Sequence, residues 1–202
     1  MLTDPPVIPP PPHFEIFWEA HRQKVILGIT VAVLCLALVG GVLLWSHAQR
    51  NAATALLANA KDKAGWQSVA DRYPRSGAAA NALLLLAGAQ RDEHNIEASN
   101  ATYTRFLKQF PHYPLAISAF LGRAVNEDSA GHPDQAINEL QQAASAYPQS
   151  YGAPIALLQK ARILARLGKI NDSKHVLQII SNQYPDSLVT TVVLRQEMPR
   201  LK

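Results

Sequence analysis

The sequence predicts an all-α protein, in which one transmembrane helix near the N-terminus is followed by an α-solenoid of helix pairs. Residues 25–45 form an uncharged apolar run of 21 residues, which is long enough to cross a bilayer as a helix. Beyond it, an aromatic residue followed by proline occurs four times with the prolines 37 residues apart: Tyr73-Pro74, Phe110-Pro111, Tyr147-Pro148 and Tyr184-Pro185. A fixed period of about 20 to 50 residues is typical of a solenoid.

The first segment, residues 1–24, is expected to be a proline-rich tail followed by a juxtamembrane stretch. Residues 1–12 contain six prolines, which exclude a helix or a sheet ladder and favour an extended chain. Phe14, Phe17 and Trp18 follow, and their spacing fits a short amphipathic helix in the headgroup region.

Residues 25–45 are expected to remain as an anchor. Ser46-His47-Ala48 resembles a signal-peptidase site, but the apolar run exceeds the roughly 7–15 residues of a signal core, which favours an uncleaved span. Arg22 and Lys24 lie at one edge of the run, whereas Arg50 lies further from the other edge. This arrangement favours a cytoplasmic N-terminus.

Composition excludes several functional classes. Beyond the span the sequence contains 17 Lys and Arg residues and 12 Asp and Glu residues, with no run of like charges. This distribution argues against a nucleic-acid surface. The only cysteine, Cys35, lies inside the span, and no two of the seven histidines have metal-ligand spacing. No phosphate loop, dinucleotide fingerprint or nucleophile elbow is present. We therefore expect no enzyme, no cofactor, no metal and no small-molecule substrate.

Aligning the segments on their prolines predicts two helices in each repeat. Small residues recur in three columns: Ala79, Ala116, Ala153; Ala82, Ala119, Ala156; and Ala87, Ala124, Ala161. They allow paired helices to approach closely. First helices are expected over 77–93, 114–130 and 151–167, and second helices over 96–109, 133–146 and 170–183. Gly131 and Gly168 share a column with His94 between the halves, where a left-handed helix end is expected. Pro133 suits a first helical position.

The ends of the array are expected to be half-units. Residues 46–74 supply a linking helix over 46–61 and a second-type helix over 65–73, with Trp66 in the column of large residues. Residues 75–198 hold the repeats and end in a capping helix over 187–198.

The pattern resembles the tetratricopeptide repeat, whose usual period is about 34 residues. The family's small, small, large and proline slots hold Ala87, Ser99, Tyr103 and Pro111, then Ala124, Ala136, Leu140 and Pro148, then Ala161, Ser173, Leu177 and Pro185. Two departures are a leucine or phenylalanine in the tryptophan slot (Leu83, Phe120, Leu157) and a longer unit. The resemblance implies a fold whose first helices line a peptide-binding groove.

The segment from Pro12 to Ala53 resembles the start of the ancillary subunit of the bacterial Sec translocon. The resemblance implies a single-pass protein of the bacterial inner membrane, with a cytoplasmic N-terminus and periplasmic repeats. It implies protein partners, namely translocon subunits, periplasmic chaperones or emerging chains, besides the lipid around the span. A scaffold for cell-wall synthesis or cell division is the alternative, since similar Tyr-Pro-x-Ser repeats occur in such proteins.

The family's groove positions, carried over, fall on the first helices. They are Asn81, Leu84 and Arg91, then Ser118, Leu121 and Asp128, then Ile155, Leu158, Arg162 and Arg166. Leu84, Leu121 and Leu158 form one column, which is either an apolar stripe for a bound segment or packing between adjacent first helices. Arg162 and Arg166 are four residues apart and would offer a site for an anionic group.

Overall fold

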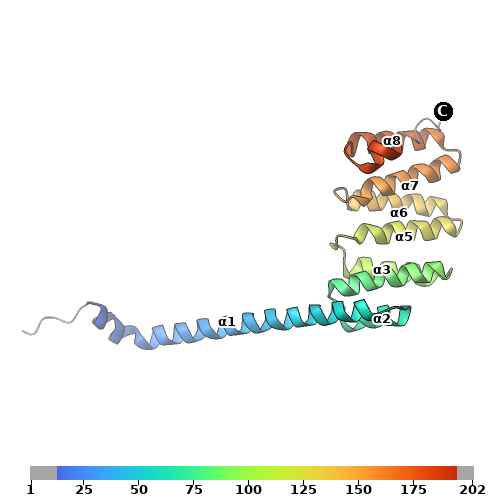
Figure 1. Ribbon diagram of the computed structural model, residues 1–202. Helices are drawn as coiled ribbons and strands as arrows, with labels where there is room; N and C mark the ends of the chain where they lie inside the picture. The colour runs from blue at the N-terminus through green and yellow to red at the C-terminus, as the bar shows by residue number, and fades with distance from the viewer. Residues whose placement is uncertain (1–12, 195–202) are drawn as a thin grey trace, which may run out of the picture. The chain divides into compact units, whose positions relative to one another are not determined.

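The computed structural model describes residues 13–194, with side chains described over 22–192, and the chain divides at residue 50 into two compact units. All regular secondary structure in the described part is helical (Figure 1). The first helix, α1 (His13–Asn59), contributes to both units, because it runs from the first unit into the first ten residues of the second. The proline-rich residues 1–12 lie outside the described part.

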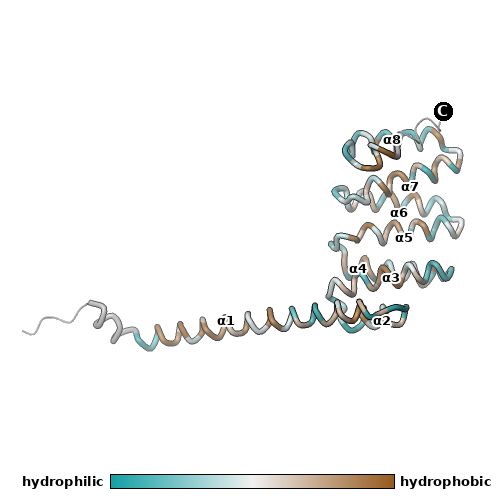
Figure 2. Tube along the Cα trace, viewed as in Figure 1, coloured by the Kyte–Doolittle hydropathy of each residue, from teal (hydrophilic) through white to brown (hydrophobic). Residues whose placement is uncertain are grey.

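The first unit consists of the N-terminal portion of α1. The stretch from Arg22 to Asn59 includes a window of mean hydropathy 2.7, none of it buried, and it is long and apolar enough to cross a membrane. The colouring in Figure 2 shows this apolar stretch between more hydrophilic ends. The predicted helix over 25–45 is therefore confirmed as a candidate span. The linking helix predicted to follow it is the continuation of α1.

The second unit is a stack of antiparallel helices, each packed on the next (Figure 1). Its elements after α1 are α2 (Lys63–Arg72), α3 (Gly77–Asp92), α4 (Ile96–Gln109), α5 (Ala116–Ser129), α6 (Pro133–Ala146), α7 (Gly152–Arg166), α8 (Ile170–Gln183) and the π-helical turn η1 (Val189–Leu194). The predicted helix pairs are confirmed with shifts of one or two residues. A capping helix was predicted over 187–198, and η1 forms the last six described residues of that range. Residues 195–198 lie outside the described part.

One shift has a clear local cause. The helix predicted from residue 114 begins at Ala116, because Pro114 lies in a turn that is closed by the Ala116 amide donating to the Tyr113 carbonyl at 2.8 Å. Tyr113 stands where the other repeats have serine. The Tyr113 hydroxyl donates to Asn81 Oδ1 on α3, at 3.1 Å.

The serines of the other Tyr-Pro-x-Ser loops accept amide hydrogen bonds where the next helix begins, and Ser76 does so as the N-cap of α3. Ser76 Oγ accepts from the Ala79 amide at 3.0 Å, and Ser187 Oγ accepts from the Thr190 amide at 3.2 Å. Ser150 Oγ accepts from the Gly152 amide at 3.2 Å. A hydroxyl in this position satisfies an amide that has no partner within the helix. The recurrence of serine after Tyr-Pro therefore follows from helix initiation.

The core lies between the first and second helices of each pair and between successive pairs. All nine alanines of the three predicted columns are at most 1% exposed. The column of large residues fills the space beside them, with Tyr103 5%, Leu140 0% and Leu177 1% exposed, while Trp66 packs partly buried at the N-terminal end. Ser99 and Ser173 are buried beside them and donate to the carbonyls of Ala87 and Ala161, each at 2.8 Å.

The turns between the two helices of a repeat have the predicted left-handed residue. Gly131 and Gly168 have φ of 84° and 76°, and His94 has φ of 61° in the same column. A side chain with a Cβ is strained in this conformation by about 1–2 kcal/mol. His94 therefore carries a strain that glycine avoids in the other two repeats.

We expect His94→Gly to raise the free energy of unfolding by about 1 kcal/mol, because glycine enters the left-handed region without this strain. Thermal unfolding of the intact protein in detergent micelles, followed by circular dichroism, measures the change. Gly131→Ala is the matched control and should lower stability by a similar amount, since nothing lies within 4 Å of its added Cβ and the backbone alone decides the sign. A destabilised His94→Gly variant would refute this account.

Candidate functional site

The candidate site is a groove of about 340 Å³ on the face formed by the first helices. It lies between α5 and α7 and reaches down to α6. Its lining consists of Ala124, Val125 and Asp128 from α5, Leu140 from α6, and Gln159, Arg162, Ile163 and Arg166 from α7. The first helices of two successive repeats, α5 and α7, are in direct contact here.

The groove has an apolar floor and a polar rim. Ala124, Leu140 and Ile163 are buried, and Val125 is 37% exposed and open to an incoming group. On the rim, Asp128 forms an ion pair with Arg166. Arg162 lies one turn before Arg166, so the lining includes two guanidinium groups and one carboxylate. The groove therefore suits a segment that combines an apolar side chain with an acidic group.

Three of the predicted site residues come together in this groove, namely Asp128, Arg162 and Arg166. Ile155 lies on the same helix and is 42% exposed. Asn81 lines a separate pocket of about 300 Å³ with Arg50, Thr54 and Leu57.

The remaining predicted residues lie on α3 and α5. Arg91 is half-buried and pairs with its neighbour Asp92 at 3.6 Å. Ser118 is also half-buried, near the start of α5.

The leucine column mainly packs the solenoid. Leu158 is 5% exposed and belongs to the core cluster that spans α5 to η1, so its side chain is not a groove surface. Leu84 and Leu121 are partly buried and pack against the two core clusters of the repeats. Of the two interpretations of this column, the structure favours packing between first helices.

Three lining residues were missed by sequence reasoning: Val125, Gln159 and Ile163. Val125 and Gln159 follow the predicted Leu121 and Ile155 by four residues, which is one helical turn on the same face. This spacing is the signal that identifies them. Ile163 follows Gln159 by another turn.

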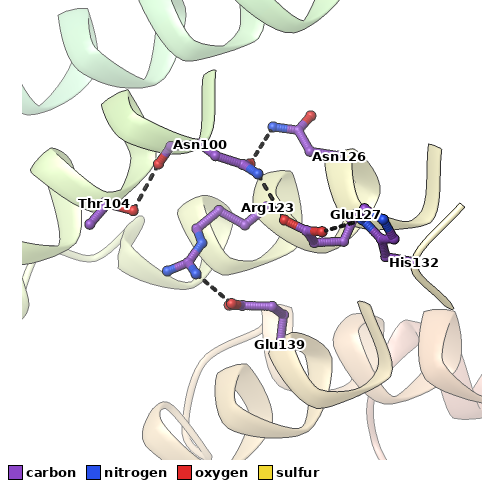
Figure 3. Close-up of polar contacts among 7 residues, drawn as sticks. All are labelled: Asn100, Thr104, Arg123, Asn126, Glu127, His132 and Glu139. Atoms are coloured by element: carbon purple, nitrogen blue, oxygen red, sulfur yellow. Dashed lines mark hydrogen bonds and ion pairs between the residues drawn. The ribbon is translucent and has the colours of Figure 1, made fainter. Parts of the chain in front are cut away.

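The end of α5 is fixed by three consecutive polar residues, of which the first two contact α4 and the third contacts α7. Asn126 is fully buried and its Nδ2 donates to Ser99 Oγ at 2.9 Å and to Asn100 Oδ1 at 2.7 Å, both on α4. Glu127 accepts from Asn100 Nδ2 at 2.9 Å and lies 3.2 Å from His132 Nδ1 (Figure 3). Asp128 pairs with α7. The rim carboxylate is thus placed by a helix end that is bound to the repeats on both sides.

A second contact, between Arg123 and Glu139, ties α5 to α6. Arg123 Nη2 donates to Glu139 Oε1 at 2.6 Å, between side chains that are 28% and 14% exposed (Figure 3). Burial raises the pKa of Glu139, while the charge of Arg123 acts in the opposite direction. This pair therefore links α5 to α6, the helix that contributes Leu140 to the groove floor.

The comparisons with known proteins agree with this architecture. The family model of the tetratricopeptide repeat matches residues 129–193, from the end of α5 to η1. No curated protein matches the chain. The alanine columns and the 37-residue period continue through α3, α4 and α5, ahead of the matched segment. The folded unit is therefore a solenoid of tetratricopeptide-like helix pairs, an architecture that is typical of protein-interaction modules.

Proposed function

We propose that the protein is a membrane-anchored scaffold of the bacterial envelope, ancillary to the Sec translocon. The observation that carries the proposal is the direct continuation of a candidate span into a solenoid with an open groove. In this proposal the N-terminus is cytoplasmic, α1 crosses the inner membrane, and the repeats are periplasmic. Partners are translocon subunits, periplasmic chaperones or chains emerging from the translocon.

The groove between α5 and α7 is the proposed partner site. Val125 and the buried floor would receive an apolar side chain, and the guanidinium groups of the rim would receive an acidic one. Ile155 extends the same surface along α7. The other carried-over positions lie on the first helices but do not line this groove: Asn81, Leu84, Arg91, Ser118, Leu121 and Leu158.

Photo-crosslinking in native membranes tests the partner. A photoreactive amino acid replaces Val125 in the intact protein, and the matched control replaces Asn182, which is exposed on the second helix α8. We expect translocon subunits or periplasmic chaperones to be recovered from position 125 and not from position 182. Recovery of cell-wall or division proteins from position 125 would replace the translocon assignment with a scaffold for those complexes.

Labelling in intact cells tests the orientation. The chain carries Cys35→Ser together with Ser129→Cys, which is exposed at the end of α5. A membrane-impermeant maleimide should label position 129 once the outer membrane is made permeable, without lysis of the inner membrane. Labelling only after lysis of the inner membrane would place the repeats in the cytoplasm.

A further inference from the structure

The edge of the solenoid that contains the Tyr/Phe-Pro loops differs in chemistry from the opposite edge. This loop edge consists of residues 73–77, 110–115, 147–151 and 184–188, together with Arg50. It is continuous. Arg50 lines a pocket with Ser76 and Gly77 of the first loop. The Tyr147 hydroxyl of the third loop donates to the Pro111 carbonyl of the second at 2.9 Å. Residues 148–151 of the third loop line a pocket with residues 183–187 at the fourth.

Basic side chains gather on the loop edge. Arg50, Arg72, Arg75 and Lys108 lie in it or in the last helical turn before it, and all four are exposed. Among the ion pairs between described residues, none involves these four side chains. The carboxylate of Asp71 nearby is neutralised by Arg105 at 2.8 Å, which leaves Asp186 as an exposed acidic residue at the far end.

The opposite edge carries acidic residues that have cationic partners. Glu93 pairs with Lys63, Asp128 with Arg166, and Asp134 with Lys169 at 3.4 Å. The exposed cations of the loop edge therefore lie outside these ion pairs, whereas these three carboxylates of the opposite edge each have a cationic partner.

Apolar side chains project from the same loop edge. Tyr151 is 96% exposed, Leu188 75% and Leu115 47%, and the first two occupy equivalent positions 37 residues apart. Along this edge, exposed arginine and lysine occur around the first two loops and exposed tyrosine and leucine in the later ones. Together they form the composition that binds the interface of an anionic bilayer.

The loop edge also begins close to the candidate span in the chain. Arg50 follows Trp45, the last residue of the apolar run, by five residues, and α1 is helical between them. At 1.5 Å per residue the distance along the helix is about 8 Å. If α1 crosses the membrane as proposed, chain continuity keeps Arg50 within a short distance of the headgroups.

From these observations we propose that the loop edge of the solenoid lies on the anionic phospholipid headgroups of the membrane that α1 crosses. The inference rests on the proposed anchoring by α1. The arginines and lysine bind lipid phosphates, and Tyr151 and Leu188 enter the interfacial region. The groove between α5 and α7 lies on a different face and remains available to protein partners.

Lipid-dependent fluorescence quenching in vesicles tests the inference with the full chain. Each variant carries Cys35→Ser and one new labelled cysteine, at Tyr151 or Leu188 on the loop edge, at Ser129 near the opposite edge, or at Leu36 in the span. The vesicles contain phosphatidylcholine and phosphatidylglycerol in equal parts, with nitroxide lipids labelled in the headgroup or in the acyl chain. Headgroup nitroxide should quench positions 151 and 188 at least about twofold more than position 129.

Charge variants separate electrostatic binding from simple proximity. Arg72→Gln, Arg75→Gln and Lys108→Gln together should reduce quenching at position 151 toward that at position 129, because each cation near an anionic surface contributes about fivefold to association. Vesicles of phosphatidylcholine alone, or high salt, should have the same effect. Asp92→Asn on the opposite edge is the control and should leave quenching unchanged.

The label at position 36 in the span distinguishes failure of the lipid-contact proposal from failure of the anchoring proposal. Quenching of position 36 by acyl-chain nitroxide, with equal quenching at positions 151 and 129, would retain the anchor and overturn the lipid contact. An unquenched position 36 would overturn the anchoring proposal itself. If position 151 is free in vesicles but protected in native membranes, the edge binds a protein and the lipid assignment is wrong.

Discussion

Gly122→Ala should be the most disruptive conservative change in the solenoid. A Cβ at Gly122 on α5 would lie 2.5 Å from the Tyr103 hydroxyl oxygen and 2.6 Å from Tyr103 Cε2. The ring cannot move aside easily, because Tyr103 is 5% exposed and packs in the core cluster with Leu83, Ala87 and Phe106. We expect the free energy of unfolding to fall by about 3 kcal/mol, at the upper end of the range for an overpacked core.

The matched control is Gly88→Ala, within α3, where nothing lies within 4 Å of the added Cβ. Alanine in an open helix interior should raise stability by about 0.5–1 kcal/mol. Thermal and guanidinium unfolding in micelles measure both variants. The double variant Tyr103→Leu, Gly122→Ala should recover much of the loss, since leucine fills the equivalent positions Leu140 and Leu177. Equal effects of the two glycine substitutions would contradict the steric account.

Phe106→Ala should cost about 3–5 kcal/mol, the usual range for removing a buried aromatic ring. Phe106 is fully buried, and its ring centroid lies 5.7 Å from that of Phe110 and 6.1 Å from that of Tyr113. The ring therefore joins the end of α4 to the turn that leads into α5. Its loss leaves a cavity between two repeats, and guanidinium unfolding should show the midpoint at a lower concentration.

Hydrogen exchange should locate the damage. Because the repeats of a solenoid contact only their neighbours, amides of α3, α4 and α5 should exchange faster while those of α8 change least. Phe106→Leu keeps most of the volume and should cost less than about 1.5 kcal/mol. Gln109→Ala, at an exposed position of the same helix, should change stability by less than about 0.5 kcal/mol. Uniform loss of protection across all helices would show that the repeats unfold as one unit.

The sequence by itself determined the local features of this protein. The helix pairs, the left-handed turns at Gly131 and Gly168, and the candidate span all depend on residues that are close in the chain. Helical spacing, turn conformation and hydropathy act over one or two turns, so a single sequence contains them. The alanine columns depend on the repeat, because a small residue that recurs at the same place in each unit predicts a close helix contact there.

The tertiary structure decided which side chains of the first helices are accessible. Leu84, Leu121 and Leu158 are equivalent in the repeat, yet Leu158 is buried in the core while the other two are half-buried. Val125 opens into the groove although its equivalents are Gly88 and Arg162. Exposure and partners depend on the volumes and charges that the neighbouring repeat presents, as in the pair between Asp128 and Arg166, which are 38 residues apart. Residues at equivalent positions of the repeat share a place on their helices, but the side chains around them differ from one repeat to the next. Contacts such as this ion pair are therefore decided by packing between repeats.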